Sequence, residues 1–376
     1  MRSTLRLPCC ASPAAALLLV VLTRPVLFAA GFVGLSLLPI HPGDGIWRGS
    51  PTTPWLGMLS RWDGFWYVDI AQHGYNYDPL AASNIAFAPV LPTLMRLGGL
   101  LLGRSDADAL VGTGVVVSNV ALLVGAGYVV ALARRAWGNE VAVRAVAWLA
   151  AWPFSFYFST IYPQALFLAL VVAAFYYTSQ RRWWLVGVLG ALAAITRQYG
   201  ALVFVPLAVE YAAQRRLRLD GAWLLLIPIT SLVWFVGVGL ATGDALAVLH
   251  TEGRWARHLM PPWDTLRLFF AAPLRWGSDD HSPLDLLFLL IYLPLVCGAW
   301  KLTTTGYALY ATLLLALPLV SGVLTSLPRF GLEWFPVFIV LARLTARRAV
   351  FIPLLAISFA ADLALFALFA VGWWIA

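Results

Sequence analysis

The residue types best suited to chemistry lie from Arg61 to Tyr75, in the stretch RWDGFWYVDIAQHGY between two long apolar blocks. Two carboxylates, Asp63 and Asp69, and the imidazole of His73 are interspersed with aromatic residues. Tryptophan and tyrosine concentrate where hydrocarbon meets lipid headgroups, because one part of each ring is apolar and another seeks water. A carboxylate held there can reach a polar substrate and a lipid-borne one together. The stretch is therefore predicted to border an active site.

Asp63 is the predicted general base, which takes the proton from an attacking hydroxyl. Two structural alternatives stay open, namely an N-cap of the helix that follows and an ion pair with Arg61. The adjacent Trp62 is a predicted substrate contact. Asp69 and His73 are four residues apart and share one face of a helix, so they are predicted to contact substrate or to support the site as a bonded pair. No third ligand stands at metal-binding spacing, and no metal site is expected.

Two arginines are predicted to hold phosphate oxygens, because a planar guanidinium binds them bidentately. Arg197 lies in ITRQYG and Arg329 in LPRFGLEWFP, each beside an apolar stretch. Arg197 could equally be an arginine whose side chain snorkels to the membrane interface. The alternative for Arg329 is an ion pair with Glu333. In the loop from His250, HTEGRWARHLMPPWDTL, tryptophans among polar groups can stack on sugars, but ordinary interfacial anchoring is the favoured interpretation.

The composition sets the class of protein that must position these residues. The chain has 376 residues, of which 61% are hydrophobic and 11% charged, with a mean hydropathy of +0.83. A soluble domain carries about 25% charged residues, so a polytopic membrane protein is indicated. Backbone groups in lipid must be satisfied within each segment, which predicts an all-α helical bundle. The net charge of +8 comes from arginines at the ends of apolar runs, a topology signal rather than a nucleic-acid surface.

About eleven transmembrane helices are predicted in one domain that covers residues 1–376. Their approximate ranges are 14–38, 110–133, 141–158, 162–178, 183–195, 201–213, 222–241, 283–300, 304–324, 334–344 and 350–374. In the first of them, Arg24 is interpreted as the true helix start, with its side chain snorkelling to the cytoplasm. The proline-broken segment 86–102 is interpreted as an interfacial or re-entrant helix in the first outer loop, about 41–108.

Charge placement predicts the orientation. With the N-terminus in the cytoplasm, the basic residues of the connections fall on the cytoplasmic side: Arg134, Arg135, Arg181, Arg182, Arg215, Arg216, Arg218, Lys301, Arg343, Arg347 and Arg348. This is the positive-inside pattern. The loops that carry Asp63 and Arg329, and the loop 242–282, then emerge together on the extracytoplasmic face.

Five segments resemble those of the GPI mannosyltransferase II-like family of integral-membrane glycosyltransferases, within the GT-C class. They are RWDGFWYVDIAQHGY, AFAPVLP from Ala86, PFSFYFSTIYPQALF from Pro153, ITRQYGALVFVP from Ile195 and PRFGLEWFPVF from Pro328. The resemblance implies a GT-C fold, Asp63 as the catalytic aspartate, a polyprenyl-phosphate sugar donor, usually mannose, and transfer with inversion.

One motif departs from the family pattern. Eukaryotic members read Tyr-Ser-Glu where this chain has Tyr162-Pro163-Gln164. Either Gln164 still binds a sugar hydroxyl, or the acceptor is recognised differently. The composition, rich in arginine and with Lys301 as its one lysine, suggests a GC-rich bacterial genome.

The sequence thus predicts a bacterial glycosyltransferase of the cell membrane that needs no cofactor or metal. Its predicted partners are a polyprenyl-phosphate donor, a glycan or lipid-linked acceptor, and membrane lipids, but not nucleic acid. Two other hypotheses are open. A transporter or flippase predicts ionisable groups inside spans and duplicated halves. A non-catalytic membrane subunit predicts that Asp63→Asn leaves function intact.

Overall fold

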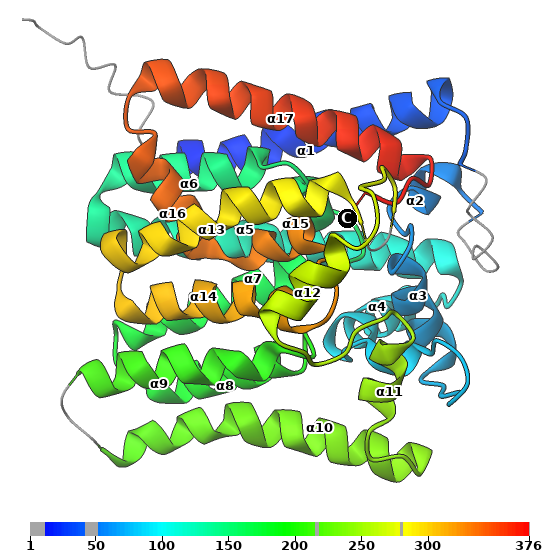
Figure 1. The fold of residues 1–376 in the computed structure, drawn as a ribbon. Coiled ribbons are helices and arrows are strands. Elements are labelled where there is room, and N and C mark those ends of the chain that lie inside the picture. The colour runs from blue at the N-terminus through cyan, green and yellow to red at the C-terminus, as the bar shows by residue number, and fades with distance from the viewer. Residues whose placement is uncertain (1–11, 42–51, 215–217, 279–280, 376) are drawn as a thin grey trace, which may run out of the picture.

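The computed structural model describes residues 12–41, 52–214, 218–278 and 281–375, and in these ranges the chain is helical without any strand. Part of the predicted outer loop, 42–51, and the predicted cytoplasmic Arg215 and Arg216 lie outside the described residues. Figure 1 shows the long helices side by side in a bundle. The predicted all-α membrane fold is confirmed.

The described helices follow one another along the whole chain. Their bounds are α1 Pro13–Leu37, α2 Pro54–Gly57, α3 Gly64–His73, α4 Val90–Leu101, α5 Ala107–Trp137, α6 Asn139–Ala151, α7 Gln164–Thr178, α8 Trp183–Ala194, α9 Phe204–Ala213, α10 Leu226–Thr242, α11 Ala247–Gly253, α12 Pro262–Phe269, α13 Pro283–Leu302, α14 Thr305–Val320, α15 Leu327–Phe330, α16 Phe335–Leu344 and α17 Arg348–Ala370. Short 3-10 turns connect several of them.

Five helical segments of the described chain are long and apolar enough to cross a membrane, namely α1, α5, α13, α17 and the continuous 3-10 and α-helical segment Leu219–Thr242. Apolar helices of 10–17 residues, such as α7 and α14, fill further predicted spans. The protein is therefore multi-pass, while the total of about eleven spans stays a prediction. The short α4, within 86–102, has 12 residues and reaches about 18 Å at 1.5 Å per residue, less than a bilayer core of about 30 Å.

The interpretation of Arg24 as a helix start is wrong. Helix α1 continues through Pro25, and Arg24 is buried at 6% exposure. Its guanidinium donates to the carbonyl oxygens of Ala150 and Ser155, and the Ser155 hydroxyl donates to Asp362 Oδ2 at 2.6 Å. The reason is the break between α6, which ends at Ala151, and the 3-10 turn that begins at Ser155, because a helix end leaves carbonyls without partners. A buried polar network thus joins α1, α6 and α17.

Replacing Arg24 with methionine is expected to destabilise the protein by about 3–5 kcal/mol, because Asp362 and two buried carbonyls lose their positive partner. Thermal melting of the purified protein in detergent would measure this as a lower Tm. The double variant Arg24→Met/Asp362→Leu should recover part of the loss. Arg104→Met serves as the control, since Arg104 is 58% exposed and pairs with the exposed Asp106. A Tm for Arg24→Met equal to that of the control would contradict the prediction.

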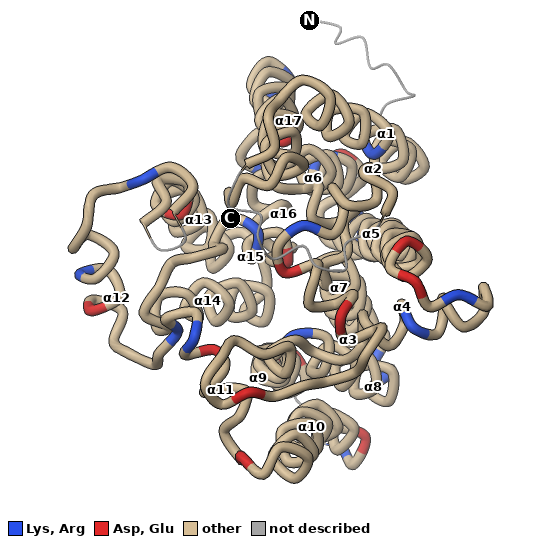
Figure 2. Tube along the Cα trace, turned by 90° about the vertical axis from the view of Figure 1, so that its right-hand side faces the viewer, with Lys and Arg blue, Asp and Glu red and all other residues tan. Residues whose placement is uncertain are grey.

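The short helices gather at one end of the bundle. Helices α2, α3 and α11 lie at the right-hand end of Figure 1, where α1 and α17 also end. Figure 2 looks onto this end, so the long helices are seen nearly end-on and α15 lies near the middle. This end therefore combines polar loops with the ends of apolar helices.

Candidate active site

A cavity of about 750 Å³ opens among these loops. Residues from α3, α11, α15 and the segment after α17 form its wall. The charged and large side chains that line it are Trp62, Asp63, Trp66, Tyr67, Phe87, Tyr162, Arg197, Gln198, Tyr199, Glu252, Arg254, Trp255, Arg257, Arg275, Arg329, Phe330 and Trp374. A cavity of this size fits a substrate rather than a single water or ion.

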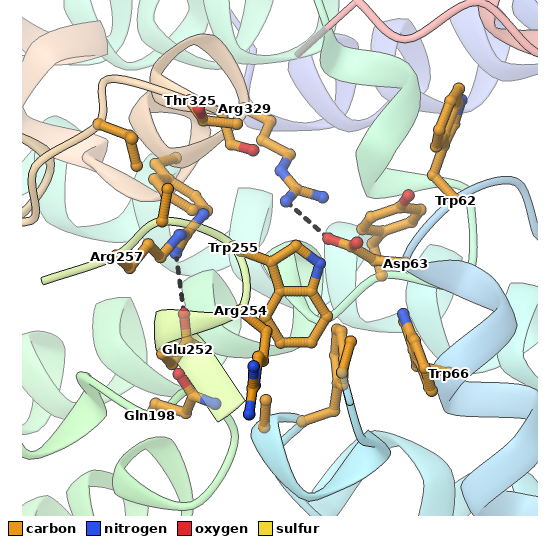
Figure 3. Close-up of a pocket in the computed structure, with 18 of the residues that line it drawn as sticks. Trp62, Asp63, Trp66, Gln198, Glu252, Arg254, Trp255, Arg257, Thr325 and Arg329 are labelled. Atoms are coloured by element: carbon orange, nitrogen blue, oxygen red, sulfur yellow. Dashed lines mark ion pairs between the residues drawn. The ribbon is translucent and has the colours of Figure 1, made fainter. Parts of the chain in front are cut away.

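The centre of the site is an ion pair between Asp63 and Arg329. Asp63 Oδ2 lies 2.6 Å from Arg329 Nη2, and the two side chains point toward each other across the cavity in Figure 3. Asp63 occupies the N-cap position of α3, but its side chain makes no capping hydrogen bond there. The pairing of Arg329 with Glu333 is likewise not seen, because Glu333 pairs with Arg197.

Arg329 stays charged despite its burial. Its side chain is 6% exposed, and burial alone would lower the pKa of the guanidinium. The charge and hydrogen bond of Asp63, together with the nearby Tyr162 and Tyr157, outweigh that effect, so the pKa of Arg329 is raised. The rings of Tyr162 and Trp374 lie 5.4 and 5.6 Å from its guanidinium carbon and add cation–π attraction. A fixed cation thus faces the cavity beside a carboxylate.

The backbone around Asp63 is held from two other parts of the chain. Trp62 has a φ of 56°, a left-handed conformation uncommon for a residue other than glycine. Its indole nitrogen donates to the carbonyl oxygen of Trp373 at 3.3 Å, and its ring meets that of Trp374 edge-on at 5.0 Å. The Tyr162 hydroxyl donates to the carbonyl oxygen of Arg61 at 2.8 Å. These contacts fix the direction in which Asp63 points.

The segment after α17 corrects the predicted last span, 350–374. Helix α17 ends at Ala370, and Gly372 turns the chain with a φ of 93° that a side chain would resist. Trp374 therefore lines the cavity instead of continuing a membrane helix. Two tryptophans directly after an apolar run are the sequence signal that could have indicated this.

Arg197 belongs to a second buried cluster at the cavity wall. It is 10% exposed, its Nε lies 3.5 Å from Glu333 Oε1, and its guanidinium donates to the Tyr199 hydroxyl at 2.5 Å. The Tyr199 hydroxyl in turn donates to Glu333 Oε2 at 2.7 Å. Burial raises the pKa of Glu333 to about 7, although Arg197 and the hydrogen bond from Tyr199 oppose the rise.

This shift predicts a pH dependence of stability. A carboxyl whose pKa rises from 4.5 to about 7 on folding binds more protons in the folded than in the unfolded state between those values. Stability from this group is therefore complete below pH 4.5 and falls as pH rises to about 7, by at most about 1.4 kcal/mol per pH unit. Melting of Glu333→Gln across that range should lack this component. The control Glu140→Gln, at a side chain 71% exposed, should follow the wild type; identical slopes in all three proteins would refute the assignment.

Three predicted substrate contacts lie elsewhere. Asp69 is bonded to His73 Nδ1 at 3.0 Å and accepts from Asn84 Nδ2 at 2.7 Å, the bonded pair that the sequence left open. Gln164 is fully buried at the start of α7. Asp69, His73 and Gln164 are not among the residues that line the cavity, whereas Trp62, Asp63, Arg197 and Arg329 are.

The loop around α11 contributes residues that sequence reasoning assigned to interfacial anchoring. Glu252, Arg254, Trp255 and Arg257 all line the cavity. Arg257 Nη1 lies 3.6 Å from Glu252 Oε2. Tryptophan alternating with charged residues in an outer loop is the signal that could have placed them in a site.

The arrangement suits transfer to a hydroxyl group with an anionic leaving group. The Asp63 carboxylate can accept a proton, and the guanidinium groups of Arg329 and Arg197 can stabilise phosphate oxygens. The aromatic rings of the lining can pack against the face of a sugar. Within the described residues, no group of three or more histidine, cysteine, aspartate or glutamate side chains could hold a metal ion.

One comparison with known proteins, the match to a family model, agrees with the resemblance seen in the sequence. A family model described as Mannosyltransferase (PIG-V) matches residues 17–215. Among solved structures, ArnT from Cupriavidus metallidurans has 15% identity and a TM-score of 0.49, with 88% of this chain and 59% of that chain covered. The oligosaccharyltransferase of Archaeoglobus fulgidus has 12% identity and a TM-score of 0.45, with 93% and 55% covered.

These structural likenesses are weak, and the chain spans less than two thirds of the length of either structure. No curated protein matches the sequence. The family match alone, which covers more than half of the chain, therefore carries weight.

Proposed function

The chain belongs to the Mannosyltransferase (PIG-V) family and is a membrane glycosyltransferase, and from this premise we propose that it transfers mannose from a polyprenyl phosphate to an acceptor hydroxyl. The observation that carries the proposal is the 2.6 Å pair between Asp63 and Arg329 in the cavity wall. It sets a proton acceptor directly beside a cation suited to phosphate. The acceptor is proposed to be a glycan or a lipid-linked molecule.

The proposed reaction is a single displacement. The acceptor hydroxyl gives its proton to Asp63 while its oxygen bonds to the anomeric carbon of the sugar. The bond between that carbon and the phosphate oxygen breaks, and its electron pair leaves with the polyprenyl phosphate. Arg329, with Arg197 at the same wall, stabilises the charge on the departing phosphate. Attack opposite to the leaving group inverts the anomeric configuration.

Support for a site on the extracytoplasmic face comes from the basic residues of the connections. Lys301 lies in the last turn of α13 and Arg348 begins α17. These helix ends lie at the end of the bundle away from α3 and α11 (Figure 1). Since basic connections favour the cytoplasm, we place the N-terminus inside and the cavity outside.

The buried charged residues give little support to the hypothesis that the protein is a transporter. It predicts ionisable groups inside spans, and Arg24 and Asp362 are such groups. However, both are engaged by hydrogen bonds within the helix packing, and neither lines the cavity. A structural role accounts for them.

The test is a transfer assay with the purified protein in lipid. Radiolabelled polyprenyl-phosphate mannose is mixed with a lipid extract of the source membranes, and label in glycolipid or glycan is counted. Label should pass to acceptor, and EDTA should not abolish the transfer, because the arginines can meet the charge of one phosphate. Transfer from nucleotide-activated mannose in place of the lipid donor would refute the proposed donor.

A further inference from the structure

The cavity has a second part, away from Asp63 and Arg329, whose purpose the proposed donor chemistry leaves open. Resting on the proposed function, we propose that Glu252, Trp255 and Gln198 form the acceptor subsite, and that the acceptor presents there a sugar or polyol ring with neighbouring hydroxyl groups. Figure 3 shows two separate ion pairs in the cavity, with Trp255 between them.

Glu252 is a carboxylate available to a ligand. Its pair with Arg257 is 3.6 Å long, beyond hydrogen-bond distance, and its side chain is 19% exposed in the cavity wall. No hydrogen bond joins its oxygens to another described side chain, in contrast to the 2.6 Å contact between Asp63 and Arg329. Carboxylate oxygens placed in this way can accept hydrogen bonds from two neighbouring hydroxyl groups.

Gln198 adds a hydrogen-bond donor with no partner in the described protein. Its Nε2 is buried and makes no hydrogen bond, although Gln198 lines the cavity. Figure 3 draws both Gln198 and Glu252 away from Asp63 and Arg329. A buried amide donor left unpaired costs free energy, and a ligand hydroxyl oxygen could satisfy it. The cavity lining thus offers both a hydrogen-bond acceptor and a hydrogen-bond donor, as a hydroxylated ligand requires.

Trp255 supplies a ring between the two parts of the cavity. Trp66 and Phe87 meet it at 6.2 and 5.9 Å, with interplanar angles of 87° and 86°. Neither of these rings therefore stacks parallel on the indole. An indole face with apolar character suits the C–H face of a sugar ring.

The hydrogen-bonding groups of this part favour a hydroxylated ring. Hydroxyl groups can donate to the Glu252 carboxylate and accept from the unpaired Gln198 amide. An acceptor bound against Trp255 would direct a hydroxyl toward Asp63, where the proposed donor carbon also lies.

The experiment measures how transfer depends on each substrate separately, with polyprenyl-phosphate mannose and the membrane glycolipid extract varied in turn. Glu252→Gln and Trp255→Ala should each raise the apparent KM for the extract about tenfold, the factor for one lost contact of about 1.4 kcal/mol. The apparent KM for the donor should stay within about twofold. Trp255→Phe, which keeps an aromatic face, should lie between wild type and Trp255→Ala. Trp263→Ala is the control, since Trp263 is 70% exposed and does not line the cavity.

Periodate supplies an independent readout, because it cleaves bonds between carbons that bear neighbouring hydroxyl groups. Extract that has been oxidised and quenched should no longer accept mannose from the wild-type protein. Full acceptance by oxidised extract would overturn the sugar assignment, and a rise in donor KM equal to that for the extract would overturn the acceptor assignment. If the wild-type protein transfers no mannose from the donor to untreated extract, the proposed function is refuted, and the acceptor subsite that rests on it is refuted as well.

Discussion

Asp63→Asn is expected to slow mannose transfer by about 10²–10⁴-fold, the contribution typical of a general base. The amide keeps the shape of the side chain but cannot take the proton of the attacking hydroxyl. The rate is measured as label transferred per unit time at saturating donor and acceptor. Because Asp63 is 24% exposed at a cavity, the variant is expected to fold.

Further measurements on Asp63→Asn distinguish the loss of the general base from weaker donor binding or lower stability. Asparagine also removes the negative partner of Arg329, so the KM for the donor and the Tm are measured together with the rate. Asp264→Asn, in α12 and outside the cavity lining, should transfer at the wild-type rate. Equal transfer by Asp63→Asn and wild type would eliminate the proposed base and favour a non-catalytic subunit.

Arg329→Lys is the second change with a large expected effect. Lysine keeps the charge but loses the planar fork that can hold two oxygens of one phosphate. The rate constant of transfer is expected to fall about 10²–10³-fold, the range for removing one group that stabilises developing charge. Single-turnover measurements of donor cleavage would report it directly.

Two other arginine variants are compared with Arg329→Lys. Arg104→Lys, at an exposed side chain, should have no effect. Arg197→Lys should show a smaller loss, because Arg197 is already engaged with Tyr199 and Glu333. A loss at Arg197 larger than that at Arg329 would mean that the leaving phosphate lies against the other cluster.

Local signals in the sequence were enough to predict the long apolar helices. Apolar runs predicted the segments that became α1, α5, α13 and α14, because hydropathy is a property of consecutive residues. They did not reveal the break after α6 or the burial of Arg24, which depend on packing between distant helices. Gly372 shows the same limit, since one turn moved Trp374 from a predicted span to the cavity.

The candidate site was predictable in its parts but not in its pairing. The chemistry of Asp63 and Arg329 could be argued from residue type and position at the ends of apolar blocks. Asp63 pairs with Arg329, and Glu333 pairs with Arg197. These pairings depend on the tertiary structure. The sequence favoured interfacial anchoring over sugar stacking for the α11 loop, because tryptophan and charge look the same in an interfacial anchor and in a cavity wall.

The ion pair between Asp63 and Arg329 also bears on the order of events. The guanidinium neutralises the carboxylate and occupies its Oδ2. We expect a phosphate that binds Arg329 to compete for Nη2 and so to free that oxygen to receive a proton. The donor would then arm the base on arrival, so an acceptor hydroxyl meets a competent carboxylate only when there is a sugar to attack.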